Sequence, residues 1–336
     1  MFVEQKKLFE PSFYKKKISL NDELFLRKRE FDRLLIENMR MRKRFVVVCG
    51  PCSADKPEAM REYLHKLKTL SEECPDLLIV ARIYSSKPHS DGQGYKGSAF
   101  HLNRGDAVDL NDGILRCREM MRECIQIGLP VADELLYPEL YECFDDLVSY
   151  WFLGARSSED SLHRGLASGL DVCCGVKNAT DGDIIKTVDS LFAVANEYVF
   201  PYNAAQIATS GNQNAHIVLR GGVSNGRYFS NIAKQNVMNA RRLLQQRGLS
   251  EFVMADLNHA NSEKIAQNQK KNAEIALKAG VDGVMIESYL NGGGHSSEYG
   301  TSQTDDCLGF GDTAQILRYL QNTFSEKRLK RKNGTH

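Results

Sequence analysis

Eight short runs rich in valine and isoleucine alternate with eight amphipathic stretches along most of this chain. The apolar runs predict strands buried on both faces, over 45–49, 78–84, 129–133, 151–155, 172–177, 215–219, 251–256 and 282–287. The amphipathic stretches predict helices over 57–73, 112–127, 138–150, 158–169, 181–196, 228–247, 261–279 and 312–325. This alternation is typical of a (β/α)8 TIM barrel. A doubly wound open sheet is the main alternative, because one sequence does not reveal strand order.

The domain organisation follows from the same pattern. No linker rich in proline, glycine or serine and no internal repeat interrupts it, so we expect one catalytic barrel over 45–325. Residues 1–44 are strongly charged and predict an N-terminal arm, partly helical and solvated, that packs on a partner subunit. Residues 326–336 predict a basic, frayed tail.

Composition excludes several classes of protein. The formal net charge of +1 argues against a dedicated nucleic-acid binder, and no apolar run approaches the length needed to span a membrane. Charges occupy the N-terminus where a signal peptide would be apolar, so we expect a cytoplasmic protein. The nine cysteines show no framework spacing, and most are expected to be buried thiols. Cys49 and Cys52 form a CxxC pair, but a redox role is disfavoured because the pair follows a strand-like run in a long chain.

Charged side chains follow the predicted strands, and the carboxyl ends of barrel strands meet at one mouth. Five of these side chains are cations: Arg82, Lys87, Arg156, Lys177 and Arg220. Five cations cannot leave water together unless anions neutralise them. The sequence therefore predicts a site for a small polyanion, such as a molecule with a phosphate and a carboxylate. A single arginine at a strand end is more often a surface ion-pair partner, but five at equivalent positions favour a binding site.

Four further residues are predicted at the same mouth: Cys52, His259, Glu287 and Asp305. A thiolate, an imidazole and two carboxylates form a mixed donor set that suits one divalent transition metal ion. Taken singly, Cys52 fits a buried thiol and His259 a core or surface histidine, because no short-range spacing links the four. Cys307 follows Asp305 by two residues, so either a disulfide with Cys52 under oxidation or a plain buried thiol is expected.

Two glycine-rich segments remain. Gly92–Gly97 matches the dinucleotide-binding pattern GxGxxG, but it does not open a helix directly after a strand, so that interpretation is rejected. Gly292–Gly294 predicts a flexible loop that orders over a ligand.

Taken together, these motifs resemble the type I 3-deoxy-D-arabino-heptulosonate 7-phosphate (DAHP) synthase family, and most closely its bacterial feedback-regulated isozymes. The matching segments run in family order from about Cys49 to Gly309: GPCSADKPEA, ARIYSSKP, GYKG, GAR, SSEDSLHRGLASGL, GVKNATDG, TSGN, HIVLRGG, DLNHANS, GVMIES and TDDCLG. Each segment alone is weak, but their combination is specific.

The resemblance implies a barrel that condenses phosphoenolpyruvate with erythrose 4-phosphate and water, releasing phosphate, as the first step of the shikimate pathway. It implies one divalent metal ion (Mn, Fe, Co or Zn), with the four metal-capable residues above as ligands. The phosphoenolpyruvate-binding residues that it implies are Arg82, Lys87, Glu134, Arg156, Lys177 and Arg220. The implied acceptor-binding residues are Pro88, His89, Ser90 and Asp305, and the implied catalytic residues are Lys87, His259 and Cys52. A dimer or tetramer is usual for the family.

Two segments depart from the family pattern. The chain has Lys-Pro-His-Ser at 87–90, where the family has Lys-Pro-Arg followed by Ser or Thr, and a histidine is a poorer phosphate ligand than arginine. Residues 195–206 also differ strongly from the family. The alternative is therefore a paralogous synthase that uses a different aldehyde. A non-catalytic ligand sensor is a third hypothesis, disfavoured because every metal-capable residue and every cation is retained.

Overall fold

Eight parallel strands close into a barrel in the computed structural model, which describes residues 1–88 and 94–332. The strands are β1 (Phe45–Gly50), β2 (Leu77–Arg82), β3 (Val131–Glu134), β4 (Tyr150–Leu153), β5 (Cys173–Lys177), β8 (Ala215–Leu219), β11 (Val253–Asp256) and β12 (Gly283–Glu287). Strand β1 pairs with both β2 and β12, so the sheet has no free edge. This closure confirms the predicted (β/α)8 barrel and excludes the open-sheet alternative.

Both faces of the strands are buried, which explains their continuous apolar sequences. In β1, Val46 and Val48 belong to the core inside the barrel, whereas Val47 and Cys49 pack against the surrounding helices. Successive side chains of a strand point to opposite faces, so one apolar run supplies both layers.

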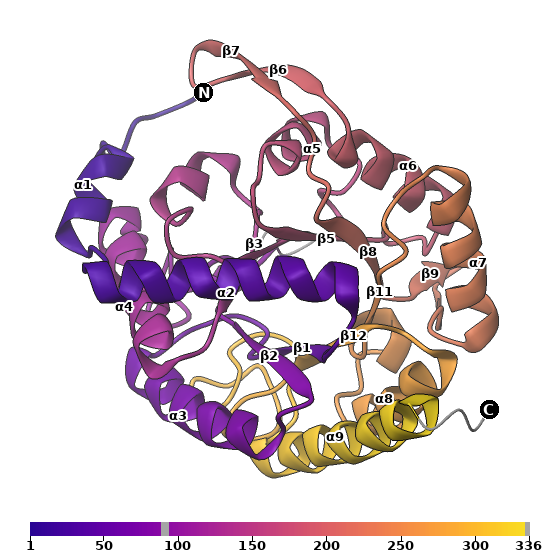
Figure 1. Ribbon diagram of the computed structural model, residues 1–336. Helices are drawn as coiled ribbons and strands as arrows, with labels where there is room; N and C mark the ends of the chain where they lie inside the picture. Colours follow the sequence, from indigo (N-terminus) through magenta and orange to yellow (C-terminus); the bar gives the residue numbers. More distant parts are fainter. Residues whose placement is uncertain (89–93, 333–336) are drawn as a thin grey trace.

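Seven helices cover the outside of the barrel (Figure 1): α3 (Pro57–Glu73), α4 (Leu110–Ile127), α5 (Ser161–Ser168), α6 (Ile184–Ala195), α7 (Lys234–Gln246), α8 (Asn268–Ala279) and α9 (Phe310–Lys332). The helix predicted over 138–150 is wrong. A short 3-10 helix, η1 (Pro138–Cys143), occurs there, because the backbone of Phe144 has already left the helical region (φ −132°) and Tyr150 opens β4.

The N-terminal arm contains α1 (Pro11–Lys17) and α2 (Asp22–Met41). Helix α2 lies across the N-terminal end of the barrel (Figure 1). Its Leu35 and Met39 are buried and join the core inside the barrel. The expectation of a solvated arm is therefore wrong for α2, which covers apolar surface that would otherwise face water.

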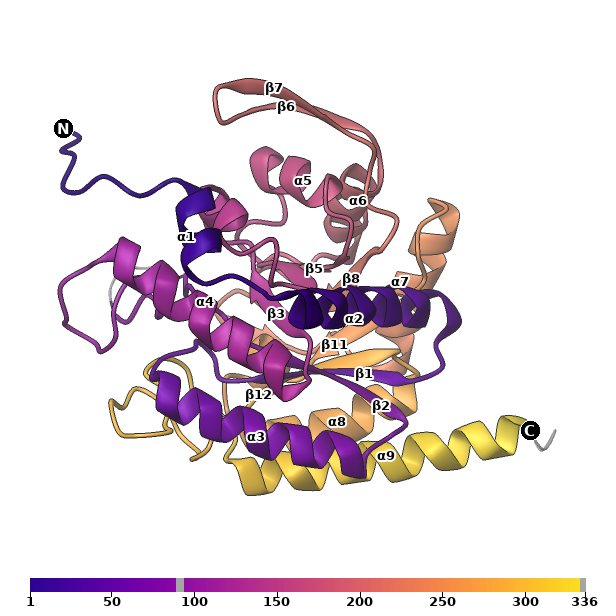
Figure 2. The same ribbon diagram turned by 60° about the vertical axis from the view of Figure 1, so that its left-hand side comes forward.

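Two hairpins were not expected from the sequence. Strands β6 (Tyr198–Tyr202) and β7 (Ala205–Thr209) form one, which projects from the barrel (Figure 2). Strands β9 (Gly222–Ser224) and β10 (Arg227–Phe229) form the other, so the helix predicted from residue 228 begins only at Lys234.

The C-terminal helix is longer than expected. Helix α9 continues to Lys332, so the first part of the segment expected as a frayed tail is helical. Over residues 1–88 and 94–332, no helix combines the length and the apolar character that a membrane span needs.

Candidate active site

Three of the four residues predicted as metal ligands converge at the C-terminal end of the barrel. Cys52 follows β1, Glu287 ends β12, and Asp305 lies in the loop before α9. One ligand atom from each, a sulfur and two carboxylate oxygens, lies within 4.8 Å of the others. Gly50, at the end of β1, leaves no room for a side chain, because a Cβ there would lie 2.2 Å from the backbone oxygen of Arg82.

The fourth predicted ligand, His259, lies beside this group but outside it. His259 opens the short 3-10 helix η2 (His259–Ser262) with a left-handed backbone (φ 46°). Its Nε2 is 3.8 Å from Glu287 Oε1, and its Nδ1 is 2.8 Å from Asp256 Oδ2. A carboxylate on the far ring nitrogen is the arrangement that orients a histidine toward a metal ion.

Lys87 lies in the middle of the group. Its ammonium donates to Cys52 Sγ and, at 3.0 Å, to Asp305 Oδ2. Lys264, which was not predicted from the sequence, has its Nζ 3.7 Å from Asp305 Oδ1. Its position five residues after His259, in the same loop segment, was the only available signal.

Arg82 is directed into the barrel. One guanidinium nitrogen donates to Glu287 Oε1 at 2.6 Å and the other to the backbone oxygen of Cys52 at 3.1 Å. The guanidinium carbon lies 3.9 Å from the centre of the Tyr84 ring. Arg82 therefore holds two metal-capable residues in position.

Glu287 is anchored from several sides. Asn258 donates to its second carboxylate oxygen, and Gln269 bonds to its backbone N–H at 2.9 Å and to its carbonyl at 3.0 Å. These contacts fix the end of β12, and neither Asn258 nor Gln269 was foreseen from the sequence.

A second group of cations lines the opposite side of the mouth. Lys177 lies 3.2 Å from Asp256 Oδ2, whereas Nη1 of the buried Arg220 has no hydrogen-bond partner among the described residues. Arg156 is exposed at the mouth and close enough to Arg220 to help lower its pKa, an effect due first to burial. A buried guanidinium nitrogen without a partner and a neighbouring exposed arginine are suited to binding an anion.

Glu134 faces this mouth at the end of β3. Its carboxylate lies against the backbone of Gly154, where a Cβ would come within 2.1 Å of Glu134 Oε1. The neighbouring Asp133 points the other way, accepting from the N–H and hydroxyl of Ser85, and burial raises its pKa to about 7.

Burial and neighbouring charges determine the charge states of Cys52, Glu287 and Asp305. Burial raises the pKa of the Cys52 thiol to about 11. Burial also acts to raise the pKa of Glu287, but the neighbouring cations, led by Arg82, hold it at about 2. The Lys87 ammonium holds the pKa of Asp305 well below its usual range. The group thus holds two carboxylates and a thiol that a divalent ion would convert to thiolate.

The other residues singled out in the sequence are Pro88, His89, Ser90 and Cys307. Pro88 is partly buried, and His89 and Ser90 lie outside the described residues. The backbone N–H of Cys52 donates to Cys307 Sγ at 3.3 Å, so the two cysteines lie close together, and both are buried.

The chain is similar to a known family of enzymes. A sequence model of the DAHP synthetase I family matches residues 40–325. The chain is 35% identical over 301 residues to the Tyr-sensitive phospho-2-dehydro-3-deoxyheptonate aldolase of Salmonella typhimurium, covering 84% of this chain and 83% of that protein. It is 36% identical over 306 residues to the Phe-sensitive enzyme of Escherichia coli, covering 85% of each.

The chain is also similar to a solved structure of an enzyme with the same name as these relatives. The phospho-2-dehydro-3-deoxyheptonate aldolase of Francisella tularensis superposes with a TM-score of 0.90 at 31% identity, covering 96% of this chain and 98% of that one. The matched segment spans every barrel strand, including the ends that carry the convergent thiol, carboxylates and cations. The chain therefore belongs to the DAHP synthetase I family.

Proposed function

We propose that this protein condenses phosphoenolpyruvate with erythrose 4-phosphate and water to give 3-deoxy-arabino-heptulosonate 7-phosphate and inorganic phosphate, the first step of the shikimate pathway. The observation that carries the proposal is the convergence of Cys52, Glu287 and Asp305 within 4.8 Å beside a group of strand-end cations. The heptonate aldolase name of the relatives supports the same acceptor, and it gives no support to a different aldehyde.

The anionic substrate would bind to the second group of cations. Phosphoenolpyruvate carries a phosphate and a carboxylate, and the unpartnered Nη1 of Arg220 and the exposed Arg156 are suited to such anions. Lys177, already paired with Asp256, would contribute long-range attraction, and Glu134 would orient the substrate from the end of β3. Arg82 would act mainly by positioning, since both of its terminal nitrogens are engaged within the protein.

One divalent metal ion (Mn, Fe, Co or Zn) would be held by Cys52, Glu287, Asp305 and His259. The fit rests on the donor set, because a sulfur and carboxylate oxygens within 4.8 Å suit a borderline or soft divalent ion. When bound, such an ion supplies Lewis acidity that polarises a carbonyl oxygen.

Lys87 is the candidate for proton transfer. Its ammonium touches the thiol of Cys52 and the carboxylate of Asp305, so it can exchange a proton with groups at the centre of the site. Asp305 and Pro88, with His89 and Ser90, would contact the acceptor aldehyde.

The proposed partners of the chain itself are further copies of it, as a dimer or tetramer. Large apolar side chains of the N-terminal segment, including Phe2, Val3 and Phe9, are exposed, which favours burial against a second copy. We also propose a cytoplasmic location, in keeping with the biosynthetic reaction.

Mass spectrometry of the reaction products tests the function. Purified protein loaded with Mn²⁺ is incubated with phosphoenolpyruvate and, in separate reactions, erythrose 4-phosphate, ribose 5-phosphate, arabinose 5-phosphate and unphosphorylated erythrose. We expect the seven-carbon phosphate product from erythrose 4-phosphate with the highest kcat/KM. Efficient turnover of another aldehyde, with none of erythrose 4-phosphate, would overturn the proposal.

A further inference from the structure

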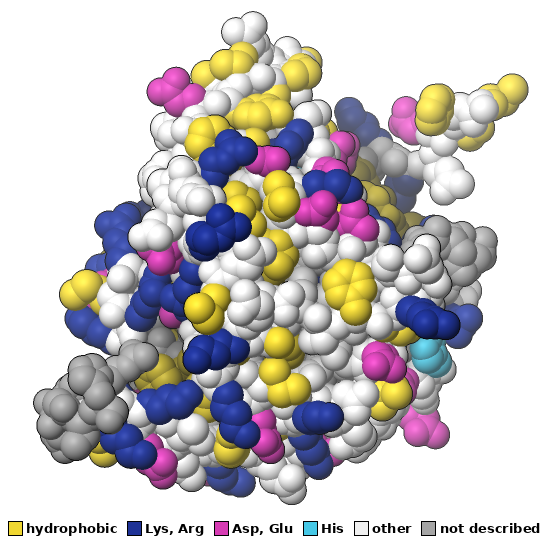
Figure 3. All heavy atoms as spheres, turned by 90° about the vertical axis from the view of Figure 1, so that its right-hand side faces the viewer, with side chains coloured by type: hydrophobic (Ala, Val, Ile, Leu, Met, Phe, Trp, Pro, Cys, Tyr) yellow, Lys and Arg dark blue, Asp and Glu magenta, His cyan; other side chains and the backbone are white. Residues whose placement is uncertain are grey.

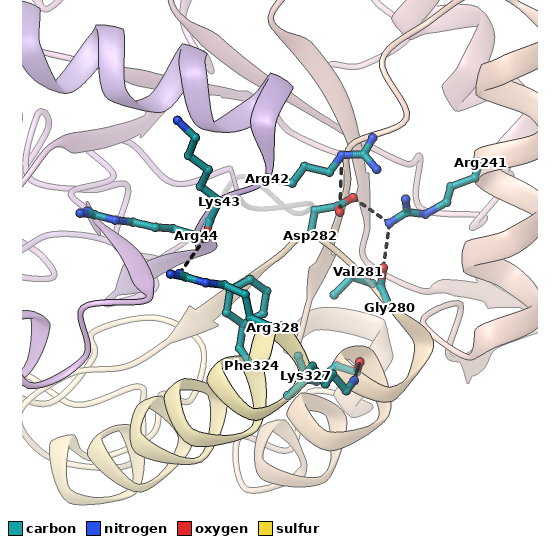
Figure 4. Close-up of a pocket in the computed structure, with 11 residues that line it drawn as sticks. Arg42, Lys43, Arg44, Arg241, Gly280, Val281, Asp282, Phe324, Lys327 and Arg328 are labelled. Carbon is teal, nitrogen blue, oxygen red and sulfur yellow. Dashed lines mark hydrogen bonds and ion pairs between the residues drawn. The ribbon is translucent and has the colours of Figure 1, made fainter. Parts of the chain in front are cut away.

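A basic hollow lies at the N-terminal end of the barrel, away from the mouth just described. Its volume is about 570 Å³, within the range of small-molecule sites. Three parts of the chain surround it (Figure 4): the link from α2 to β1, the end of α8 with the link that leads to β12, and the last turns of α9, while Arg241 reaches in from α7.

Positive charge dominates the lining of this hollow. Six of its residues are cations: Arg42, Lys43, Arg44, Arg241, Lys327 and Arg328. Among the described residues, the one carboxylate that lines it is Asp282, which pairs with Arg241 at 2.7 Å and lies 3.7 Å from Arg42 Nε. Figure 3 shows lysine and arginine side chains gathered on the side of the molecule that carries α7. The hollow therefore has a clear excess of positive charge.

Arg44 is the cation most available to a ligand. Lys43 pairs with Glu37 at 3.0 Å, and Arg328 contacts Asp76. No hydrogen bond or ion pair joins the Arg44 guanidinium to any other residue in the described ranges 1–88 and 94–332. An exposed guanidinium without an internal partner keeps its forked donors for an anion.

The backbone that carries Arg44 is fixed in advance. Arg42, the residue that follows α2, is in the left-handed conformation (φ 50°), which turns the chain toward β1. The buried side chain of Asn38 accepts from the N–H of Arg44 at 2.8 Å and donates to its carbonyl at 2.9 Å. A pre-positioned arginine loses less entropy when a ligand binds.

The remaining lining of the hollow is apolar. Phe324, Leu277 and Val281 contribute to it, and Phe324 packs on Phe45 with ring centres 5.6 Å apart. In Figure 4 the Phe324 ring lies beside Arg328. An apolar surface next to cations fits a ligand with an apolar body and an anionic group.

We propose that this hollow is a second binding site, separate from the active site, for a small organic anion that carries a phosphate on an aromatic or otherwise apolar body. A nucleic-acid ligand is disfavoured, because the chain as a whole has a net charge of only +1 and the hollow is compact.

The site also has a defined relation to the mouth. Arg44 directly precedes β1 and Asp282 directly precedes β12, and these strands pair in register from Val46 with Gly283 to Gly50 with Glu287. The hollow is therefore one strand length, about 17 Å, from the strand ends that lead to Cys52 and Glu287. Binding in the hollow thus need not compete directly with substrate.

Isothermal titration calorimetry with phenyl phosphate tests the proposal. Arg44→Glu is compared with Arg242→Glu, an equal charge reversal at an exposed residue of α7 that bonds Gln246 and Asn239 and lies outside the hollow. We expect Arg44→Glu to weaken binding about tenfold or more and Arg242→Glu to change it less than about twofold. Equal affinity in both variants would overturn the proposal. Thermal unfolding checks that each variant is folded. If Arg44→Glu does not fold, Arg44→Ala takes its place in the titration.

Two further titrations define the site and its ligand. Phenyl phosphate should still bind the Arg156→Ala variant, whereas loss of binding there would locate the ligand at the mouth and contradict a second site. Inorganic phosphate should bind more weakly than phenyl phosphate, and equal affinity would refute the role of the apolar lining. These outcomes do not depend on which aldehyde the enzyme uses.

Discussion

The guanidinium of Arg82 and the carboxylate of Glu287 form a buried ion pair at 2.6 Å, each side chain only 1% exposed. The two residues lie at the ends of β2 and β12, on either side of β1. Charges taken so far out of water depend on neighbouring charges and hydrogen bonds, and Arg82 is the leading cation beside Glu287, so the pair fixes one wall of the site.

Replacing Arg82 with methionine should destabilise the protein strongly. The variant leaves Glu287 buried without its main cation, which is expected to cost about 3–5 kcal/mol of unfolding free energy. Urea unfolding in the presence of a chelator measures this. The double variant Arg82→Met/Glu287→Gln should regain a large part of the loss, and a single variant as stable as wild type would contradict the assignment.

Cys52→Ser should abolish metal-dependent activity while leaving the barrel folded. A serine hydroxyl stays protonated and is a poor ligand for soft divalent ions, so activity should fall about 100-fold or more and metal content should fall with it. Cys74→Ser, at the end of α3, is the matched control and should keep both its activity and its metal content. Undiminished metal content in Cys52→Ser would show that the thiol is not a ligand.

Arg156→Ala should raise the KM for phosphoenolpyruvate and lower kcat, because a cation expected to contact the substrate is lost. Steady-state kinetics with each substrate varied in turn measure both constants. A change confined to the KM of the aldehyde would mean that Arg156 serves the acceptor instead.

Gly154→Ala should disturb substrate binding more than stability. The new methyl group would meet Glu134 Oε1 at 2.1 Å, and the flexible carboxylate can move away. We expect a several-fold increase in the KM for phosphoenolpyruvate and a stability cost below about 2 kcal/mol. In a Glu134→Ala background the same substitution should have almost no further effect on KM, and an undiminished effect there would refute the contact.

His216 should make stability depend on pH. It lies inside the barrel with Nε2 2.7 Å from the Tyr150 hydroxyl, and burial lowers its pKa to about 3. Below about pH 6.5 the unfolded chain takes up a proton at this residue while the folded protein does not. The free energy of unfolding should therefore fall by about 4 kcal/mol as the pH drops from about 6.5 to about 3.

The double variant His216→Phe/Tyr150→Phe isolates this effect. It replaces both hydrogen-bond partners with apolar rings and leaves no buried polar group of the pair unsatisfied. Urea unfolding of both proteins across this pH range should show a shallower pH dependence for the variant. Parallel curves would mean that His216 does not titrate as its burial requires.

The sequence predicted the regular part of the fold well, because it depends on short-range pattern. Strand β8 occupies the predicted residues 215–219, and α3 occupies the predicted 57–73. The β6–β7 hairpin was not predicted, since it turns at Asn203 and Ala204, two non-glycine residues with positive φ. The burial of α2 was missed because its few apolar contacts, such as Leu35, depend on the closed barrel beneath them.

The sequence predicted that the side chains of the site meet at one mouth, but not how they pair. Strand ends were a reliable guide to Cys52 and Glu287, because all barrel strands point to one mouth. The sequence could not show that Arg82 bonds to Glu287 inside the protein, while a guanidinium nitrogen of Arg220 lacks a partner among the described residues. Such differences arise from side-chain packing between segments that are distant in sequence.

A crystal structure with Mn²⁺ and phosphoenolpyruvate, with anomalous scattering recorded at the manganese edge, tests the central claim most directly. We predict one anomalous peak in contact with Cys52 Sγ and the carboxylates of Glu287 and Asp305, with the substrate phosphate or carboxylate against Arg220. A peak elsewhere, or a substrate bound away from Arg156 and Arg220, would contradict the account.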